Sequence, residues 1–244
     1  MEKASRLNSI IEVIKSSPLR VNKIFIQKDT KKRKIGEIIN LANASDIPLL
    51  FVPRRTLDHM DRNHQGVVAL LSSKEFSSLE SILGSSKLPF LVLLDGIEDP
   101  QNLGAIIRSA EGAGVDGILI PERRSVGLTR AVSTVSAGAL EHVEIARVKN
   151  LARTMDDLKK RDVWLVGAEG GRKEYWHEFD YKLPIGLVLG SEGKGLRPLI
   201  KKKCDRVLSI PLFGNITSLN VAAAASIFFY EVVRQRTFSL NNPG

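Results

Sequence analysis

The sequence predicts an α/β fold in which a mostly parallel sheet carries helices on both faces, with a smaller α/β domain in front of it. Six nearly continuous apolar runs predict the sheet, because strands buried on both faces lack polar alternation. Helical segments alternate with these runs, as is typical of parallel strands joined by crossover helices. The apolar runs lie at residues 90–95, 117–121, 143–148, 163–168, 185–190 and 207–211, and the helical segments at 102–114, 129–140, 150–161, 197–203 and 218–236. Asn102 and Asn150 stand at positions where N-caps are expected.

The first part of the chain alternates in the same way over shorter segments. Helices are expected at 5–17 and 34–46, where apolar residues recur at helical spacing, and strands at 21–27, 47–53 and 66–72. A serine-rich stretch follows. We therefore expect one domain at 1–75, a linker at 76–88 and a second domain at 89–244.

The composition is that of an ordinary globular protein of 244 residues, with 43% hydrophobic and 26% charged residues. No apolar run approaches the roughly 18 residues of a membrane span, and the start lacks the apolar core of a signal peptide. The single cysteine, Cys204, cannot form a disulfide within the chain. We therefore expect a reducing, cytoplasmic location and no membrane association.

The net charge of +9 favours an anionic partner, most readily a nucleic acid, although a merely soluble basic protein has the same balance. Residues 1–88 hold 15 Lys/Arg and 9 Asp/Glu, so the shorter front part carries a net +6. Two basic clusters concentrate this excess and are candidate phosphate contacts, with solvated surface charge as the alternative: Lys31, Lys32, Arg33, Arg54 and Arg55.

Three polar, glycine-bearing segments follow predicted strands, and ligands bind parallel sheets beyond the carboxyl ends of strands. In the first, residues 95–114, Gly104 and Arg108 share one helical face, and the guanidinium could grip a phosphate or pair with Glu111 on the surface. In the second, residues 189–198, Ser191 and Glu192 stand among three glycines. That loop fails the P-loop pattern and suits a nucleoside or carboxylate, or is an ordinary tight turn.

The third segment, residues 214–229, places a glycine turn and polar residues before four alanines. Ser218 or Asn220 can cap the following helix or face a ligand. The small side chains of 222–225 let another backbone, or a partner subunit, pack closely. No metal-ligand spacing and no GxSxG elbow occurs in the sequence, so we expect neither a metal nor a hydrolase triad.

Together these three segments resemble the ordered motifs of the SpoU (TrmH-like) RNA ribose 2′-O-methyltransferases of the SPOUT superfamily. The matching stretches are NLGAIIRSAEGAG (102–114), VLGSEGKGL (188–196) and IPLFGNITSLNVAAAASI (210–227). NHQGVVAL (63–70) and residues 127–154 extend the likeness toward the branch that methylates a guanosine of 23S rRNA. The front domain resembles the family's RNA-binding domain, which is related to ribosomal proteins L30e and L7Ae. Its first helix departs from the family pattern and keeps only Asn8 of the usual entry.

The resemblance implies S-adenosylmethionine as methyl donor, a trefoil-knotted C-terminal domain and a homodimer. It implies catalytic roles for Arg108, Asn102, Glu192, Ser218 and Asn220, and cofactor contacts at Leu189, Gly190, Glu192, Gly193, Ile210, Leu219 and Asn220. Arg108 would act as a general base or, more easily for a guanidinium, bind phosphate and stabilise the forming alkoxide. Glu192 would orient Arg108 or accept the proton.

The expected function is therefore S-adenosylmethionine-dependent 2′-O-methylation of a ribose in RNA, with a guanosine of 23S rRNA as the preferred target. Two alternatives stay open. One is a tRNA 2′-O-methyltransferase of the same family, and the other is a non-catalytic RNA-binding or ribosome-assembly factor.

Overall fold

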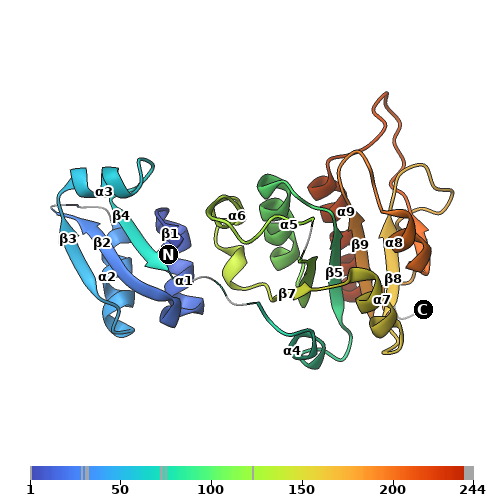
Figure 1. Cartoon of the computed structure of the whole chain (residues 1–244), viewed down its shortest axis with the longest axis horizontal. Coiled ribbons are helices and arrows are strands. Elements are labelled where there is room, and N and C mark those ends of the chain that lie inside the picture. Colours follow the sequence, from blue (N-terminus) through green and yellow to red (C-terminus); the bar gives the residue numbers. More distant parts are fainter. Residues whose placement is uncertain are drawn as a thin grey trace. The chain divides into compact units, whose positions relative to one another are not determined.

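The computed structural model describes residues 2–28, 30, 33–71, 74, 76–122 and 124–238. The chain forms two compact units (Figure 1). The first contains residues 1–75 together with 128–142, and the second contains 76–127 and 143–244. The chain therefore passes from one unit to the other three times. None of the described helices combines the length and apolar character that a membrane span requires.

The first unit is built on a four-stranded sheet in the order β1-β4-β2-β3. Its strands are β1 (Glu2–Ala4), β2 (Val21–Gln27), β3 (Leu49–Val52) and β4 (Val67–Leu71). Only β2 and β3 are parallel, and β4 runs antiparallel to its two neighbours. The helices are α1 (Leu7–Ser16), the 3₁₀ turn η1 (Pro18–Arg20), α2 (Arg33–Ala44) and α3 (Arg54–Met60). The predicted helices and strands are present, whereas β1 and α3 were not expected.

A segment from the middle of the chain completes this first unit. It contains α6 (Arg130–Ser136) and the 3₁₀ turn η2 (Ala139–Glu141), which pack against β1 and α1. His142 Nε2 lies 2.8 Å from Glu12 Oε2, and Arg20 forms an ion pair with Glu141. These contacts join residues more than 100 positions apart in the sequence.

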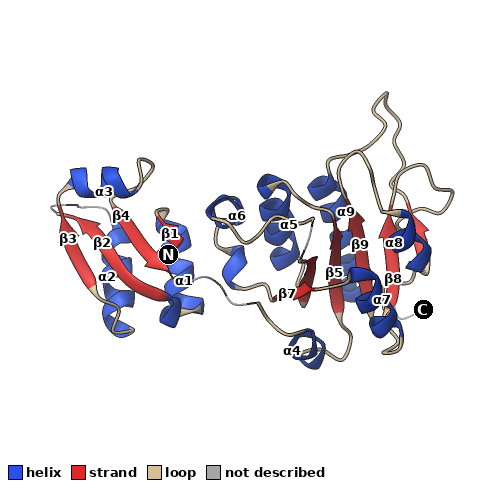
Figure 2. Cartoon of the chain, viewed as in Figure 1, coloured by secondary structure: helices blue, strands red, loops and turns tan. Residues whose placement is uncertain are grey.

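The second unit contains a six-stranded, fully parallel sheet in the order β10-β8-β9-β5-β6-β7 (Figure 2). The strands are β5 (Phe90–Asp95), β6 (Gly117–Pro121), β7 (Ile145–Val148), β8 (Trp164–Ala168), β9 (Ile185–Gly190) and β10 (Arg206–Leu208). The helices are α4 (Leu79–Gly84), α5 (Pro100–Gly112), α7 (Leu151–Lys159), α8 (Pro198–Lys203) and α9 (Val221–Phe238). The predicted parallel α/β fold is confirmed.

Helices cover both faces of this sheet because alternate residues of each strand point to opposite sides. Leu91 and Leu93 of β5 belong to a core that includes residues of α4, α7 and α8. Phe90, on the other face of β5, packs edge-on against Phe229 of α9, with 5.8 Å between ring centroids. Helix α9 in turn packs against α5, where Ser226 Oγ donates to Ser109 Oγ at 2.8 Å.

One local prediction was wrong. Asn102 is not an N-cap, because α5 begins two residues earlier at Pro100. Asp99 caps the helix by accepting a hydrogen bond from Gln101 N, and proline at the first helical position loses no intrahelical bond. The segment predicted as a linker contains helix α4, whose Ile82 side chain is buried. Asn150 does cap α7, as predicted.

Candidate active site

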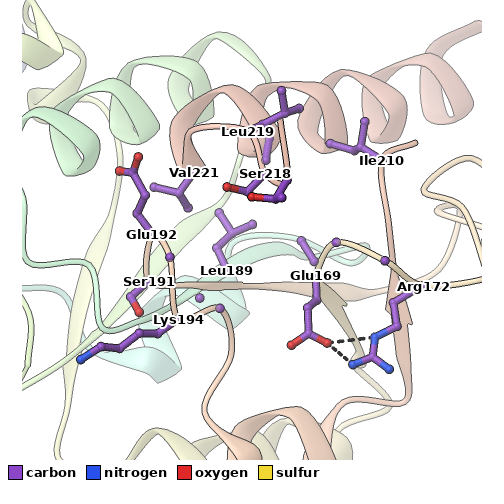
Figure 3. A pocket seen from close by; sticks show the side chains of 18 of the residues that line it. Glu169, Arg172, Leu189, Ser191, Glu192, Lys194, Ile210, Ser218, Leu219 and Val221 are labelled. Carbon is purple, nitrogen blue, oxygen red and sulfur yellow. Dashed lines mark hydrogen bonds and ion pairs between the residues drawn. The ribbon is translucent and has the colours of Figure 1, made fainter. Parts of the chain in front are cut away.

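The candidate site lies at the carboxyl edge of the parallel sheet, where loops that follow β8, β9 and β10 enclose one cavity of about 710 Å³ (Figure 3). This volume is within the usual range for small-molecule and cofactor sites. The lining comes from three segments and from the start of α9: Ala168, Glu169, Gly170, Gly171, Arg172, Leu189, Gly190, Ser191, Glu192, Gly193, Lys194, Gly195, Ile210, Leu212, Thr217, Ser218, Leu219, Val221, Ala224 and Phe228.

Glycine is required where β9 turns into the wall of the cavity. A Cβ on Gly190 would lie 2.2 Å from the carbonyl carbon of Gly195, far inside van der Waals contact. The turn closes through a hydrogen bond of 2.9 Å from Gly195 N to Ser191 O, and Gly193 and Gly195 adopt φ of +79° and +64°. The backbone itself therefore forms this wall, so a ligand can contact peptide groups directly.

An ion pair at the carboxyl end of β5 fixes the far end of the same loop. The buried Asp95 carboxylate accepts hydrogen bonds from Arg197 N at 3.0 Å and from Arg197 Nε at 2.6 Å. Arg197 is the residue before helix α8. The loop between β9 and α8 is thus tied to the central strand of the sheet.

Three polar side chains from distant parts of the sequence meet beside the cavity. Asn102 Nδ2 of α5 donates to Glu192 Oε2 at 3.0 Å, and Asn220 Nδ2 donates to Asn102 Oδ1 at 2.8 Å. Asn220 Oδ1 accepts from Ala222 N at 2.9 Å and so caps helix α9. The sequence predicts either Ser218 or Asn220 as the cap of this helix, and in the structure Asn220 makes the contact.

The predicted site residues fall into three groups. Asn102, Glu192 and Asn220 form the hydrogen-bonded cluster described above. The remaining predicted cofactor contacts line the cavity, as does Ser218: Leu189, Gly190, Gly193, Ile210 and Leu219. Arg108 is exposed on α5, outside the cavity lining, and among the described residues it has no hydrogen bond or ion pair.

Sequence reasoning missed a second charged group at the other end of the cavity from Glu192. Glu169 accepts hydrogen bonds from Arg172 Nε at 2.9 Å, and its Oε2 lies 2.6 Å from Lys201 Nζ (Figure 3 shows Glu169 and Arg172). The stretch AEGGR (168–172) follows strand β8 just as the recognised loops follow their strands. Its two glycines at the carboxyl end of a buried strand were the available signal.

The predicted RNA contacts that the structure describes, Arg33, Arg54 and Arg55, stand at the starts of helices α2 and α3 of the first unit. Strands β2 and β3 are parallel neighbours, and Lys28 N donates to Val52 O at 2.9 Å just beyond β2. Helices α2 and α3 follow these two strand ends, so the fold brings their amino ends to the same edge of the sheet. Arg33, Arg54 and Arg55 are exposed there, whereas Lys31 and Lys32 lie outside the described residues. Within the described ranges, no three His, Cys, Asp or Glu side chains gather as a metal site.

Comparison with known proteins gives two family-model matches. Residues 89–230 match the SpoU rRNA Methylase family, and residues 7–77 match a model described as RNA 2′-O ribose methyltransferase substrate binding. The chain is 42% identical over 234 residues to YacO of Bacillus subtilis, which is assigned to the TrmH family of tRNA/rRNA methyltransferases, with 94% of each chain covered.

Solved structures show the same fold. The SpoU methyltransferase AviRb from Streptomyces viridochromogenes is similar with a TM-score of 0.83 and 26% identity, over 98% of this chain and 90% of that one. A second structure of AviRb, in complex with the cofactor AdoMet, has a TM-score of 0.82 at 24% identity, over 96% and 90% of the two chains.

Fold and site thus define an α/β protein with a backbone-lined cavity at the carboxyl edge of a parallel sheet. The chain belongs to the SpoU (TrmH) family of RNA methyltransferases.

Proposed function

We propose that this protein transfers a methyl group from S-adenosylmethionine to a ribose 2′-hydroxyl in RNA. One observation carries the proposal: Asn102, Glu192 and Asn220, from three separate segments, meet at the end of a glycine-walled cavity at the sheet edge. The matches to the methylase and substrate-binding models support it, as does the AdoMet complex of AviRb. We propose residues 89–244 as the catalytic domain, 76–88 as the connection and 1–75 as the RNA-binding domain, with residues 128–142 packed against this last domain.

The cavity fits the cofactor chemically. Leu189, Ile210, Leu219 and Phe228 give it apolar surface for a purine ring, and the glycine wall at 190–195 exposes peptide groups for hydrogen bonds to ribose and amino-acid moieties. The cofactor, when bound, supplies a methyl group on a positively charged sulfur and leaves as a neutral thioether. The residues proposed to hold it are Leu189, Gly190, Glu192, Gly193, Ile210, Leu219 and Asn220.

Around the reacting hydroxyl, we assign Glu192 and Arg108 complementary roles. Glu192 lies at the cavity with its carboxylate held by amide donors and is placed to accept the proton of the 2′-hydroxyl. Arg108 donates hydrogen bonds from its guanidinium to the substrate phosphate or to the forming alkoxide. Ser218 also lines the cavity, and we assign it a contact with the substrate. Orientation of the hydroxyl supplies much of the rate.

For the target, we propose a guanosine of 23S rRNA. The resemblance of the front domain to the rRNA-directed branch supports this choice, and the basic edge with Arg33, Arg54 and Arg55 supports RNA binding by that domain. The alternative target is tRNA, since the Bacillus relative is assigned to a family of tRNA/rRNA methyltransferases.

The deciding experiment compares ribose methylation in rRNA and tRNA from cells with and without the gene. Purified full-length protein is then incubated with labelled S-adenosylmethionine and transcripts of each RNA. Loss of one 23S guanosine methylation, restored by the protein, supports the proposal. A missing methyl in tRNA selects the alternative target. Failure to bind the cofactor in calorimetry contradicts the enzyme assignment and leaves a non-catalytic RNA-binding factor.

The family resemblance also leads us to propose a homodimer and a trefoil knot. The loops at 189–195 and 210–221 line the same cavity although a helix and a strand separate them in the sequence, which is the proximity that threading would require. Light scattering coupled to gel filtration tests the dimer, for which twice the chain mass of 26.9 kDa is expected.

A further inference from the structure

The amino end of helix α9 fixes the orientation of the Asn220 amide. Asn220 Oδ1 accepts from Ala222 N at 2.9 Å and lies 3.4 Å from Ala223 N. Backbone N–H groups can only donate, so the side-chain oxygen must face the helix. The amide nitrogen, Nδ2, therefore has to point away from the helix.

This orientation determines the next two hydrogen bonds. Asn220 Nδ2 donates to Asn102 Oδ1 at 2.8 Å, so the oxygen of Asn102 is committed as an acceptor. Asn102 must then donate through Nδ2, and it does so to Glu192 Oε2 at 3.0 Å. Asn102 is only 7% exposed, so solvent offers little alternative to these partners. The three hydrogen bonds are those from Ala222 N to Asn220, from Asn220 to Asn102 and from Asn102 to Glu192. In each of them the donor is the group nearer to α9.

Glu192 is the end of this series and can only accept. Its Oε2 receives Asn102 Nδ2 and has Asn220 Nδ2 at 3.5 Å as a second donor. Neither amide nitrogen can accept a hydrogen bond, so Glu192 Oε2 is the acceptor in both contacts. Among the described residues the other oxygen, Oε1, has no hydrogen-bond donor, and Glu192 lines the cavity.

We propose that Asn102 and Asn220 are positioning residues that form a one-way hydrogen-bond relay, which turns Glu192 Oε1 toward the cavity as a free acceptor for a substrate hydroxyl. The relay rests on the proposed function for its use in catalysis, but its hydrogen-bond direction is a property of the folded protein alone. The amino end of helix α9 therefore determines which oxygen of Glu192, on the loop after β9, is available to a substrate.

Stability provides a readout that does not depend on activity. Asn220→Asp keeps an N-cap acceptor but loses the amide donor, so Asn102 turns and presents its oxygen to Glu192, placing two acceptors together. We expect the Tm to fall by about 3 °C. In a Glu192→Gln background, the glutamine amide can donate to the turned Asn102, and the same substitution should then cost less than about 1 °C.

These comparisons form a double-mutant cycle of positions 220 and 192, and two further variants serve as its controls. Asn215→Asp makes the same charge change in the same loop, where Asn215 has no hydrogen bond to any described residue, and it should leave the Tm unchanged in both backgrounds. Asn102→Ala removes the residue that connects Asn220 to Glu192. The difference between the Tm changes that Asn220→Asp causes in the two backgrounds should therefore become smaller. Should Asn220→Asp fail to fold, Asn102→Asp tests the same point, because the introduced carboxylate opposes Glu192 but accepts a hydrogen bond from a glutamine at position 192.

The relay is overturned if Asn220→Asp lowers the Tm equally in both backgrounds, or if the coupling is unchanged in Asn102→Ala. For catalysis, Asn220→Asp should lower kcat, measured at saturating S-adenosylmethionine, at least about 10-fold. An inactive wild type would contradict the proposed function, whereas the Tm cycle would still decide the relay.

Discussion

Asp95 and Arg197 join the central strand β5 to the start of helix α8 through two hydrogen bonds, of 3.0 Å from the backbone N and 2.6 Å from Nε. The Asp95 side chain is completely buried, while the Arg197 side chain is 42% exposed. The pair closes the loop that forms the glycine wall of the cavity, so its loss should affect both stability and cofactor binding.

We expect Asp95→Asn to reduce the free energy of unfolding by about 2–3 kcal/mol, because the buried amide loses the charge and places its own N–H group against a donor of Arg197. Urea unfolding followed by circular dichroism measures this loss. Asp157→Asn is the control, because Asp157 forms an exposed pair with Lys160 and should give no measurable change. Equal stability of the two variants would contradict the role given to Asp95.

Gly190→Ala should abolish cofactor binding, because the added methyl group would lie 2.2 Å from the Gly195 carbonyl carbon and displace the wall. Isothermal titration with S-adenosylmethionine measures the effect. As a control, Gly36→Ala adds a methyl group in helix α2 where no atom lies within 4 Å, and it should stabilise the protein by about 0.5–1 kcal/mol. Normal binding by Gly190→Ala would show that the backbone wall does not hold the cofactor.

Arg108→Ala should remove methyl transfer while the Kd for the cofactor stays within about 3-fold of wild type, because Arg108 lies outside the cavity lining. Single-turnover assays with labelled cofactor, combined with calorimetry, separate the two effects. Arg153→Ala, on the exposed face of α7, is the matched control. Wild-type turnover in Arg108→Ala would refute the proposed catalytic role.

Replacing Arg54 and Arg55 by alanine should weaken RNA binding and reduce its dependence on salt. Each lost phosphate contact should lower the slope of log K against log salt by about 0.7–0.9. Filter binding of full-length protein across a salt series gives the slope. Arg161→Ala removes an exposed arginine of the second unit and should leave the slope unchanged. An unchanged slope in the double variant would place the RNA contacts elsewhere.

Burial raises the pKa of the Cys204 thiol to about 12, with smaller contributions from nearby charges such as Lys159, which lowers it. Because the thiolate is the reactive form, Ellman's reagent at pH 8 should react roughly 10³-fold more slowly with the folded protein than with the unfolded chain. The same shift means that this thiol favours the folded state below pH 9 and that its contribution is lost as the pH rises from about 9 to about 12. Rapid labelling of the folded protein would show that the thiol is accessible.

The sequence allowed the six strands of the parallel sheet to be predicted because each is an uninterrupted apolar run, and it indicated which loops lie at the carboxyl edge. The candidate site residues Asn102, Glu192 and Asn220 could be selected from these loops. Which of these side chains donates and which accepts could not be predicted, because it depends on how side chains about 90 to 120 positions apart are oriented.

Other features lacked a local signal. Helix α3 is seven residues long with one buried side chain, Leu57, which is too few for a helical period to be recognised. The pairing of Glu169 with Lys201 depends on the packing of α8 near the end of β8 and not on sequence spacing. Helix α5 starts at Pro100, after the cap Asp99, whereas the sequence pattern predicted Asn102 as its cap.

Residues 128–142 make it difficult to exchange the first 75 residues of this protein for those of a relative. They pack with residues 1–75, and the buried Ala139 and Leu140 would be uncovered in a fragment that begins at residue 76. Removing residues 1–75 would therefore expose apolar side chains of the remaining fragment as well as remove the basic edge. A hybrid in which only the first 75 residues are exchanged would pair them with residues 128–142 of a different protein. A successful chimera has to carry both stretches together.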